Sequence, residues 1–187
     1  MILIQLTGLS GAGKTTLAYK VGEALNVSGR KSVVLDGDDY RKTLCSDLGF
    51  SYSDRMENIR RLGKLAYEYM LKGDIAIISA INPFEEGRQE LQRLYGAKTI
   101  WIDCALEVLQ KRDTKGLYRR AMLPDSHPEK LTNLTGVNDR FEAPISADLH
   151  ICTHLETIDM SVNQMINYIN EILMDKLTLT TNQHSFA

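Results

Sequence analysis

The chain opens with Met1-Ile-Leu-Ile-Gln-Leu-Thr-Gly8-Leu-Ser-Gly-Ala-Gly13-Lys14-Thr15-Thr16. Residues 2–6 are an apolar run too short for a buried helix, and a helical pattern begins at Lys14. The residues between them match G-x-x-x-x-G-K-[ST], a motif that requires a strand before it and a helix after it. The stretch therefore predicts a phosphate-binding loop that joins a buried strand to a helix.

The composition of this loop indicates how a nucleotide would bind. Glycines allow successive backbone N–H groups to surround phosphates, and the following helix adds the partial positive charge of its N-terminus. We expect Lys14 to reach the β- and γ-phosphates of ATP and the Thr15 hydroxyl to ligate Mg²⁺. The expected ATP-binding residues are Gly8, Ser10, Gly11, Ala12, Gly13, Lys14, Thr15 and Thr16.

Short apolar runs alternate with helical patterns along the rest of the chain. The runs cover residues 2–6, 33–35, 75–78, 99–102 and 149–151. The helical patterns cover residues 14–26, 54–71, 83–94, 106–111 and 158–174. This alternation is typical of an α/β fold with a doubly wound parallel sheet, and the loop makes it a P-loop NTPase fold of the nucleotide-kinase type.

The 187 residues suit one domain, which we expect to span residues 1–176. Residues 112–140 interrupt the alternation with a long polar segment, and long connections inside compact domains are usually functional. We expect this segment to be a lid. The Thr- and Asn-containing end, residues 177–187, is expected to be a flexible tail.

The 22 basic and 24 acidic residues nearly cancel, so we expect neither a nucleic acid nor a membrane as partner. The three cysteines form no C-x-x-C pair, which argues against a disulfide framework or a zinc site. The four histidines show no metal-ligand spacing. Neither a signal peptide nor a membrane-spanning run is evident, so we expect a cytoplasmic protein.

The second apolar run ends in Asp36-Gly-Asp38-Asp39, at the carboxyl end of a predicted strand, where ligands of α/β proteins bind. Phosphoryl transfer to a hydroxyl needs an ordered Mg²⁺ ion and a carboxylate that orients the hydroxyl or accepts its proton. Asp38 can serve either purpose, as a Mg²⁺ ligand together with Thr15 or as the carboxylate that acts on the hydroxyl. We expect Asp38 and Lys14 to be the catalytic residues. A GTPase would need an N-K-x-D motif, which this sequence lacks. A kinase is therefore favoured over a GTPase.

Longer motifs resemble adenylyl-sulfate kinases. They are Asp36-Gly-Asp-Asp-Tyr-Arg-Lys-Thr-Leu44, Asp47-Leu-Gly-Phe-Ser51, Asp54-Arg-Met-Glu-Asn-Ile-Arg-Arg61, Ile81-Asn-Pro-Phe84, Arg112-Asp-Thr-Lys-Gly-Leu-Tyr118 and Leu134-Thr-Gly-Val-Asn-Asp-Arg-Phe-Glu-Ala-Pro144. The resemblance extends from Leu3 to about Leu173. It implies transfer of the ATP γ-phosphoryl group to the 3′-hydroxyl of adenylyl sulfate, a step of sulfate assimilation. It also implies that the chain can form a homodimer.

The resemblance also implies roles for single residues. Arg112 would pack on the ATP adenine, Phe50 would stack on the acceptor adenine, and Lys115 would meet the phosphosulfate. Independently of it, Arg55 and Asn58 share a helix face, and Arg41 and Arg55 suit an anionic acceptor. The expected acceptor-binding residues are Asp38, Arg41, Phe50, Arg55, Asn58, Ile81, Asn82, Lys115 and Leu134.

Three positions differ from the usual family pattern. Asp39 stands where the family has Asn, Asn82 where it has Ser, and Leu134 where a second aromatic wall would stand. The last two favour an alternative: a kinase of the same fold for another nucleotide, such as cytidine diphosphoramidate. A non-catalytic nucleotide-binding regulator is the third hypothesis, which the retained Lys14, Thr15 and Asp38 disfavour.

Overall fold

The computed structural model describes residues 1–184 and contains a five-stranded sheet in which all paired strands are parallel. The strands are β1 (Ile2–Thr7), β2 (Ser32–Asp36), β3 (Ile75–Ser79), β4 (Lys98–Asp103) and β5 (Leu149–Cys152). Their spatial order is β2-β3-β1-β4-β5. The predicted parallel α/β fold is confirmed, and each apolar run forms a strand.

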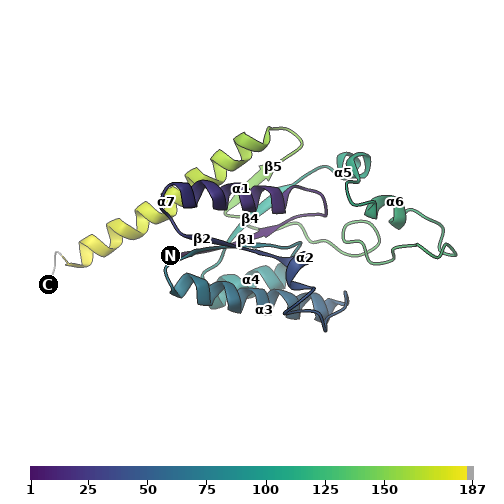
Figure 1. The fold of residues 1–187 in the computed structure, drawn as a ribbon, viewed down its shortest axis with the longest axis horizontal. Helices are drawn as coiled ribbons and strands as arrows, with labels where there is room; N and C mark the ends of the chain where they lie inside the picture. The colour runs from purple at the N-terminus through teal and green to yellow at the C-terminus, as the bar shows by residue number, and fades with distance from the viewer. Residues whose placement is uncertain (185–187) are drawn as a thin grey trace.

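Helices cover both faces of the sheet (Figure 1). On one face, α1 (Lys14–Val27) and α7 (Ile158–His184) bury a cluster that includes Leu17, Val21, Met165 and Ile169. On the other face, α3 (Tyr52–Leu71) and α4 (Glu85–Tyr95) bury a second cluster. Gly63 allows the close approach of α3 to α4, because a Cβ there would lie 2.2 Å from Leu91.

The remaining helices are short and lie at the carboxyl ends of the strands (Figure 1). They are α2 (Gly37–Tyr40), α5 (Leu106–Arg112) and α6 (Leu117–Ala121). We did not predict α2 and α6, since helices of 4 and 5 residues are too short to show a helical period. A Ser51–Asp54 capping box fixes the start of α3.

The C-terminal part differs from the sequence expectation. The last helix was expected to end at residue 174, but α7 continues to His184. The tail expected over residues 177–187 is therefore helical through His184, and its last three residues lie outside the described part of the chain. Within the described residues, no helix combines the length and apolar character needed to cross a bilayer.

Candidate active site

The phosphate-binding loop lies between β1 and α1, with Gly8, Gly11 and Gly13 at positive φ. Gly8 tolerates no side chain, because a Cβ there would lie 2.0 Å from the carbonyl oxygen of Ile102. The Lys14 ammonium folds back over the loop and donates to the carbonyl oxygens of Gly8 and Leu9, at 2.9 and 2.8 Å. The loop therefore presents a buried cation at the start of a helix, which suits a phosphate chain.

Burial lowers the pKa of Lys14 to about 8, against the opposing effect of the Asp38 carboxylate. Phosphates favour the charged amine, so above pH about 8 the binding of ATP must be accompanied by uptake of a proton. We expect the affinity for ATP to fall above this pH, by up to about tenfold per pH unit for one linked proton. Calorimetry in buffers of different ionisation enthalpy measures both the affinity for ATP and the number of protons taken up on binding. Lys14→Met should remove the proton uptake, whereas an affinity independent of pH in the parent protein would contradict the assignment.

The Thr15 hydroxyl meets oxygen atoms from two strand ends. It donates to Oδ2 of Asp36 at 2.7 Å and lies 3.3 Å from the Ser79 hydroxyl. Asp36 ends β2 and Ser79 ends β3, so their adjacency follows from the pairing Asp36↔Ser79 in the parallel sheet. Hydroxyl and carboxylate oxygens are ligands that Mg²⁺ prefers. The site fits this ion.

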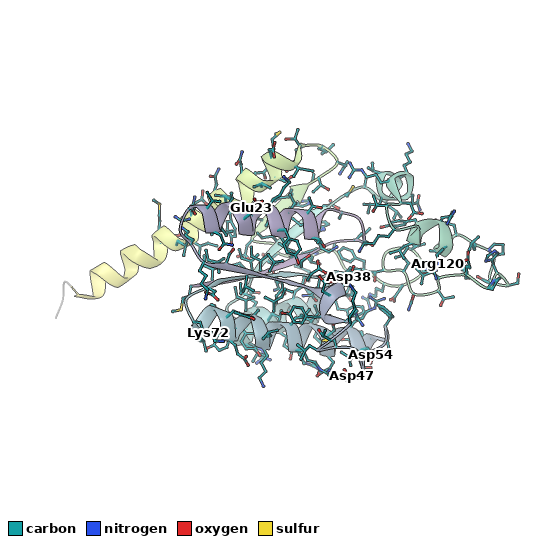
Figure 2. All side chains as sticks on the ribbon, viewed as in Figure 1. Glu23, Asp38, Asp47, Asp54, Lys72 and Arg120 are labelled. Carbon is teal, nitrogen blue, oxygen red and sulfur yellow. The ribbon has the colours of Figure 1, made fainter. Side chains whose placement is uncertain are left out.

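Asp38 lies on α2, just beyond the sheet (Figure 2). Its backbone N–H donates to Oδ1 of Asp36, which caps α2. Its Oδ2 accepts from the Lys115 ammonium at 2.6 Å. Partial burial favours the neutral acid, but Lys115, helped by Lys14, outweighs it and lowers the pKa of Asp38. The carboxylate is therefore ionised at neutral pH, as a proton acceptor must be.

Asp36, Asp38, Lys14 and Lys115 border a cavity of about 240 Å³ above the phosphate-binding loop. Its lining residues are Ser10, Gly11, Gly13, Lys14, Thr15, Thr16, Asp36, Asp38, Ser79, Ala80, Ile81, Thr114 and Lys115. Most of the predicted ATP-binding residues thus surround one space. Ala12 is buried below the loop in the core instead.

A second cavity, of about 60 Å³, opens beside the first. Two arginines border it with Phe50: the guanidinium carbons of Arg41 and Arg55 lie 4.4 and 5.5 Å from the centre of the Phe50 ring. Burial and the neighbouring charge of Arg55 lower the pKa of Arg41. Arg41 is therefore suited to an anionic ligand, whereas the Arg55 guanidinium is paired with the Asp139 carboxylate at 2.7 Å.

Asn58 borders the second cavity and carries one buried polar atom without a partner. The residue is 5% exposed, and its Oδ1 has no hydrogen-bond partner among the described residues. Buried polar atoms are nearly always hydrogen-bonded, so an exception needs an explanation, and a bound ligand or water is one. A donor on the ligand, such as a base amine, would satisfy it.

The two cavities share three lining residues: Asp38, Ala80 and Ile81. A ligand in one cavity and a ligand in the other would therefore meet at the Asp38 carboxylate. This arrangement suits transfer of a group between two bound molecules, with Asp38 at the point of transfer.

The other predicted residues lie as follows. Arg112 borders a small pocket beside the phosphate-binding loop that Lys115 also lines. Asn82 borders the second cavity, but its amide nitrogen donates to Gln5, and its φ is 41°. Leu134 is 5% exposed and belongs to the core cluster of α1 and α7. The structure thus brings Arg112 and Asn82 to the edges of the site and places Leu134 in the core.

Four residues of the site were not assigned from the sequence: Asp36, Ser79, Tyr118 and Asp139. Asp139 accepts from Nη2 of Arg55 at 2.7 Å, and Arg55 is 6% exposed. The Tyr118 hydroxyl donates to the Ser10 carbonyl at 2.8 Å and ties α6 to the phosphate-binding loop. Asp36 and Ser79 could have been found from their positions at strand ends, whereas nothing local signals Tyr118 or Asp139.

The chain resembles known proteins over most of its length. The sequence model of adenylylsulphate kinase matches residues 1–152. The adenylyl-sulfate kinase of Picosynechococcus sp. is 38% identical over 172 residues, 91% of this chain and 94% of that protein. That of Pseudomonas aeruginosa is 38% identical over 170 residues, 89% and 84% of the two chains.

A solved structure agrees with these sequence relatives. The APS kinase of Mycobacterium tuberculosis, described in complex with AMPPNP and APS, superposes with a TM-score of 0.83 and 32% identity. The alignment covers 90% of this chain and 97% of that one. Because the family model matches residues 1–152 and relatives of similar length are 38% identical over about nine tenths of the chain, the chain belongs to the adenylylsulphate kinase family.

Proposed function

We propose that this chain is an ATP-dependent kinase that transfers the γ-phosphoryl group to the 3′-hydroxyl of adenylyl sulfate. The products are ADP and 3′-phosphoadenylyl sulfate. The observation that carries the proposal is the position of Asp38, which lines both the cavity above the phosphate-binding loop and the cavity of Arg41, Phe50, Arg55 and Asn58.

The phosphate-binding loop holds the polyphosphate of ATP, with Lys14 directed at the β- and γ-phosphates. Asp38 accepts the proton of the acceptor hydroxyl as its oxygen forms a bond to the γ-phosphorus. The bond from that phosphorus to the β–γ bridging oxygen breaks, and its electron pair leaves with ADP. Arg41 offsets the charge of the acceptor anion, while Arg55, paired with Asp139, and Asn58 line the cavity that holds the rest of the acceptor.

Lys115 occupies Oδ2 of Asp38, so the acceptor hydroxyl must either displace the lysine or approach the other carboxylate oxygen. The lysine lies in the predicted lid, residues 112–140, between α5 and α6. We infer that an arriving phosphosulfate draws Lys115 away and frees the carboxylate. The lid then excludes water from the γ-phosphate.

Thr15, with Asp36 beside it, would hold Mg²⁺; Asp38, the other ligand expected from the sequence, is engaged with Lys115. The ion would neutralise charge on the β- and γ-phosphate oxygens.

The acceptor is tested by coupled ADP release with adenylyl sulfate, cytidine diphosphoramidate and simple nucleosides. We expect adenylyl sulfate to give the highest kcat/KM. Turnover equal to the water blank with adenylyl sulfate, together with turnover of another acceptor, would contradict the proposal. No turnover with any acceptor despite ATP binding would indicate a regulator.

Removing the Phe50 ring is expected to weaken acceptor binding. A base–aromatic stack contributes about 1–3 kcal/mol, so Phe50→Ala should raise the KM for adenylyl sulfate by about 5- to 150-fold. The KM for ATP should not change, since Phe50 does not border the cavity above the phosphate-binding loop. Phe50→Tyr keeps the ring and should retain the parent value. An unchanged acceptor KM in Phe50→Ala would exclude stacking at this position.

A further inference from the structure

Three metal-ligating side chains gather at the carboxyl ends of β4 and β5, apart from the two cavities described above. They are Asp103, His150 and Cys152, and their ligand atoms all lie within 4.8 Å of one another. The register explains the cluster, because Asp103 pairs with Cys152 and His150 is two residues before Cys152. In a strand, residues two apart share a face. The isoleucines at 100, 102 and 151 fill the core on the opposite face.

The two distances from His150 to its neighbours agree with those of a tetrahedral metal centre. His150 Nε2 lies 3.2 Å from Asp103 Oδ2 and 3.6 Å from Cys152 Sγ. Ligands at the usual zinc distances in tetrahedral geometry are separated by about 3.3 Å for nitrogen and oxygen and about 3.5 Å for nitrogen and sulfur. His150 thus already lies at metal-ligand spacing from both neighbours, and the Asp103 carboxylate and Cys152 Sγ lie within 4.8 Å of each other.

The surroundings orient the ligands and leave the cluster accessible. The His150 ring stacks on Trp101, with centroids 4.1 Å apart and an interplanar angle of 6°, which fixes the direction of its nitrogens. The side chains of His150 and Asp103 are 43% and 33% exposed, so solvent reaches the site and a water can complete the coordination. One nitrogen, one sulfur and one oxygen ligand form a donor set suited to Zn²⁺ or Co²⁺ and poorly suited to Mg²⁺.

We propose that Asp103, His150 and Cys152 bind a zinc ion in tetrahedral geometry, with water as the fourth ligand. The sequence expectation that the cysteines and histidines form no zinc site rested on spacing along the chain, and this cluster arises across two strands. The next residue, Thr153, donates from its hydroxyl to the carbonyls of Ala12 and Asp103. A bound ion would therefore stabilise the ends of β4 and β5, to which the phosphate-binding loop is hydrogen-bonded through Thr153.

Titration of the metal-free protein with Co²⁺ tests the site, because a thiolate ligand gives a charge-transfer band and tetrahedral coordination gives strong visible bands. We expect both at one equivalent, and Zn²⁺ should abolish both by displacing Co²⁺. Co²⁺ bound at the phosphate-binding loop would have only oxygen ligands there and would give no thiolate band. The band therefore distinguishes Co²⁺ in the Asp103, His150 and Cys152 cluster from Co²⁺ at the loop.

Cys152→Ser should lose the thiolate band. His150→Ala should weaken Zn²⁺ binding by at least about tenfold, because even the loss of a residue that only hydrogen-bonds to a metal ligand has an effect of this size. His127→Ala, in a turn of the 122–148 segment, is the matched histidine control and should bind Zn²⁺ like the parent. Parent protein that shows no thiolate band would overturn the proposal, as would a band that survives in Cys152→Ser. Circular dichroism of each variant verifies folding.

Discussion

Replacing Asp38 by asparagine is expected to lower kcat by about 10²- to 10⁴-fold, the range that a positioned general base contributes. The amide keeps the shape of the carboxylate but cannot take the proton of the acceptor hydroxyl. The backbone N–H of residue 38 still donates to Asp36, so α2 should persist. Coupled ADP release measures the rate, and calorimetry should find ATP binding largely retained.

Asp39→Asn is the matched control for this substitution. Asp39 is exposed and pairs with Lys42, and it borders neither cavity. The change also introduces the residue usual in the family at this position. It should leave kcat near the parent value. Equal rates for Asp38→Asn and Asp39→Asn would show that Asp38 takes no part in proton transfer.

Replacing Lys14 by methionine is expected to reduce kcat/KM by about 10²- to 10³-fold, as the loss of one preorganised electrostatic contact does in other enzymes. Methionine retains the apolar stem of the buried side chain but removes the charge directed at the phosphates. Lys14 is 8% exposed, so little solvent surrounds its charge, which therefore acts on the phosphates with little screening. Steady-state kinetics with varied ATP separates the loss in binding from the loss in turnover.

Lys20→Met is the control, because Lys20 lies exposed on the same helix. We expect the kinetics of Lys20→Met to match those of the parent. That result would show that removing a lysine from α1 does not by itself impair the enzyme. Normal ATP affinity and turnover in Lys14→Met would mean that the loop binds phosphates through its backbone alone. The unchanged thermal stability of both variants would verify that the difference is local.

Much of the fold could be predicted from the sequence, because its signals are local. Five apolar runs became the five strands, and the Gly8–Thr15 motif stands in its required place between β1 and α1. Asp38 was located from its position after a strand. The short helices α2 and α6 and the extension of α7 to His184 were not predicted, since none has a complete pattern of its own.

The acceptor side was predicted less completely, because its contacts cross long stretches of chain. Arg55 was expected near the acceptor, but Asp139, which lies 84 residues away and holds its guanidinium, was not. Leu134 was expected in the acceptor pocket but lies in the core. The path of residues 122–148 decides which way the Leu134 side chain faces, and this path has no local sequence signal.

The sequence by itself determined the parallel α/β fold, the phosphate-binding loop and the kinase family, because each depends on residue types at fixed spacing along the chain. Only the tertiary structure decided the strand order, the pairing of Thr15 with Asp36, and the meeting of two cavities at Asp38. It also brought Asp103 to His150 and Cys152. These contacts depend on strand register and loop path, which arise from packing the whole chain and have no local signature.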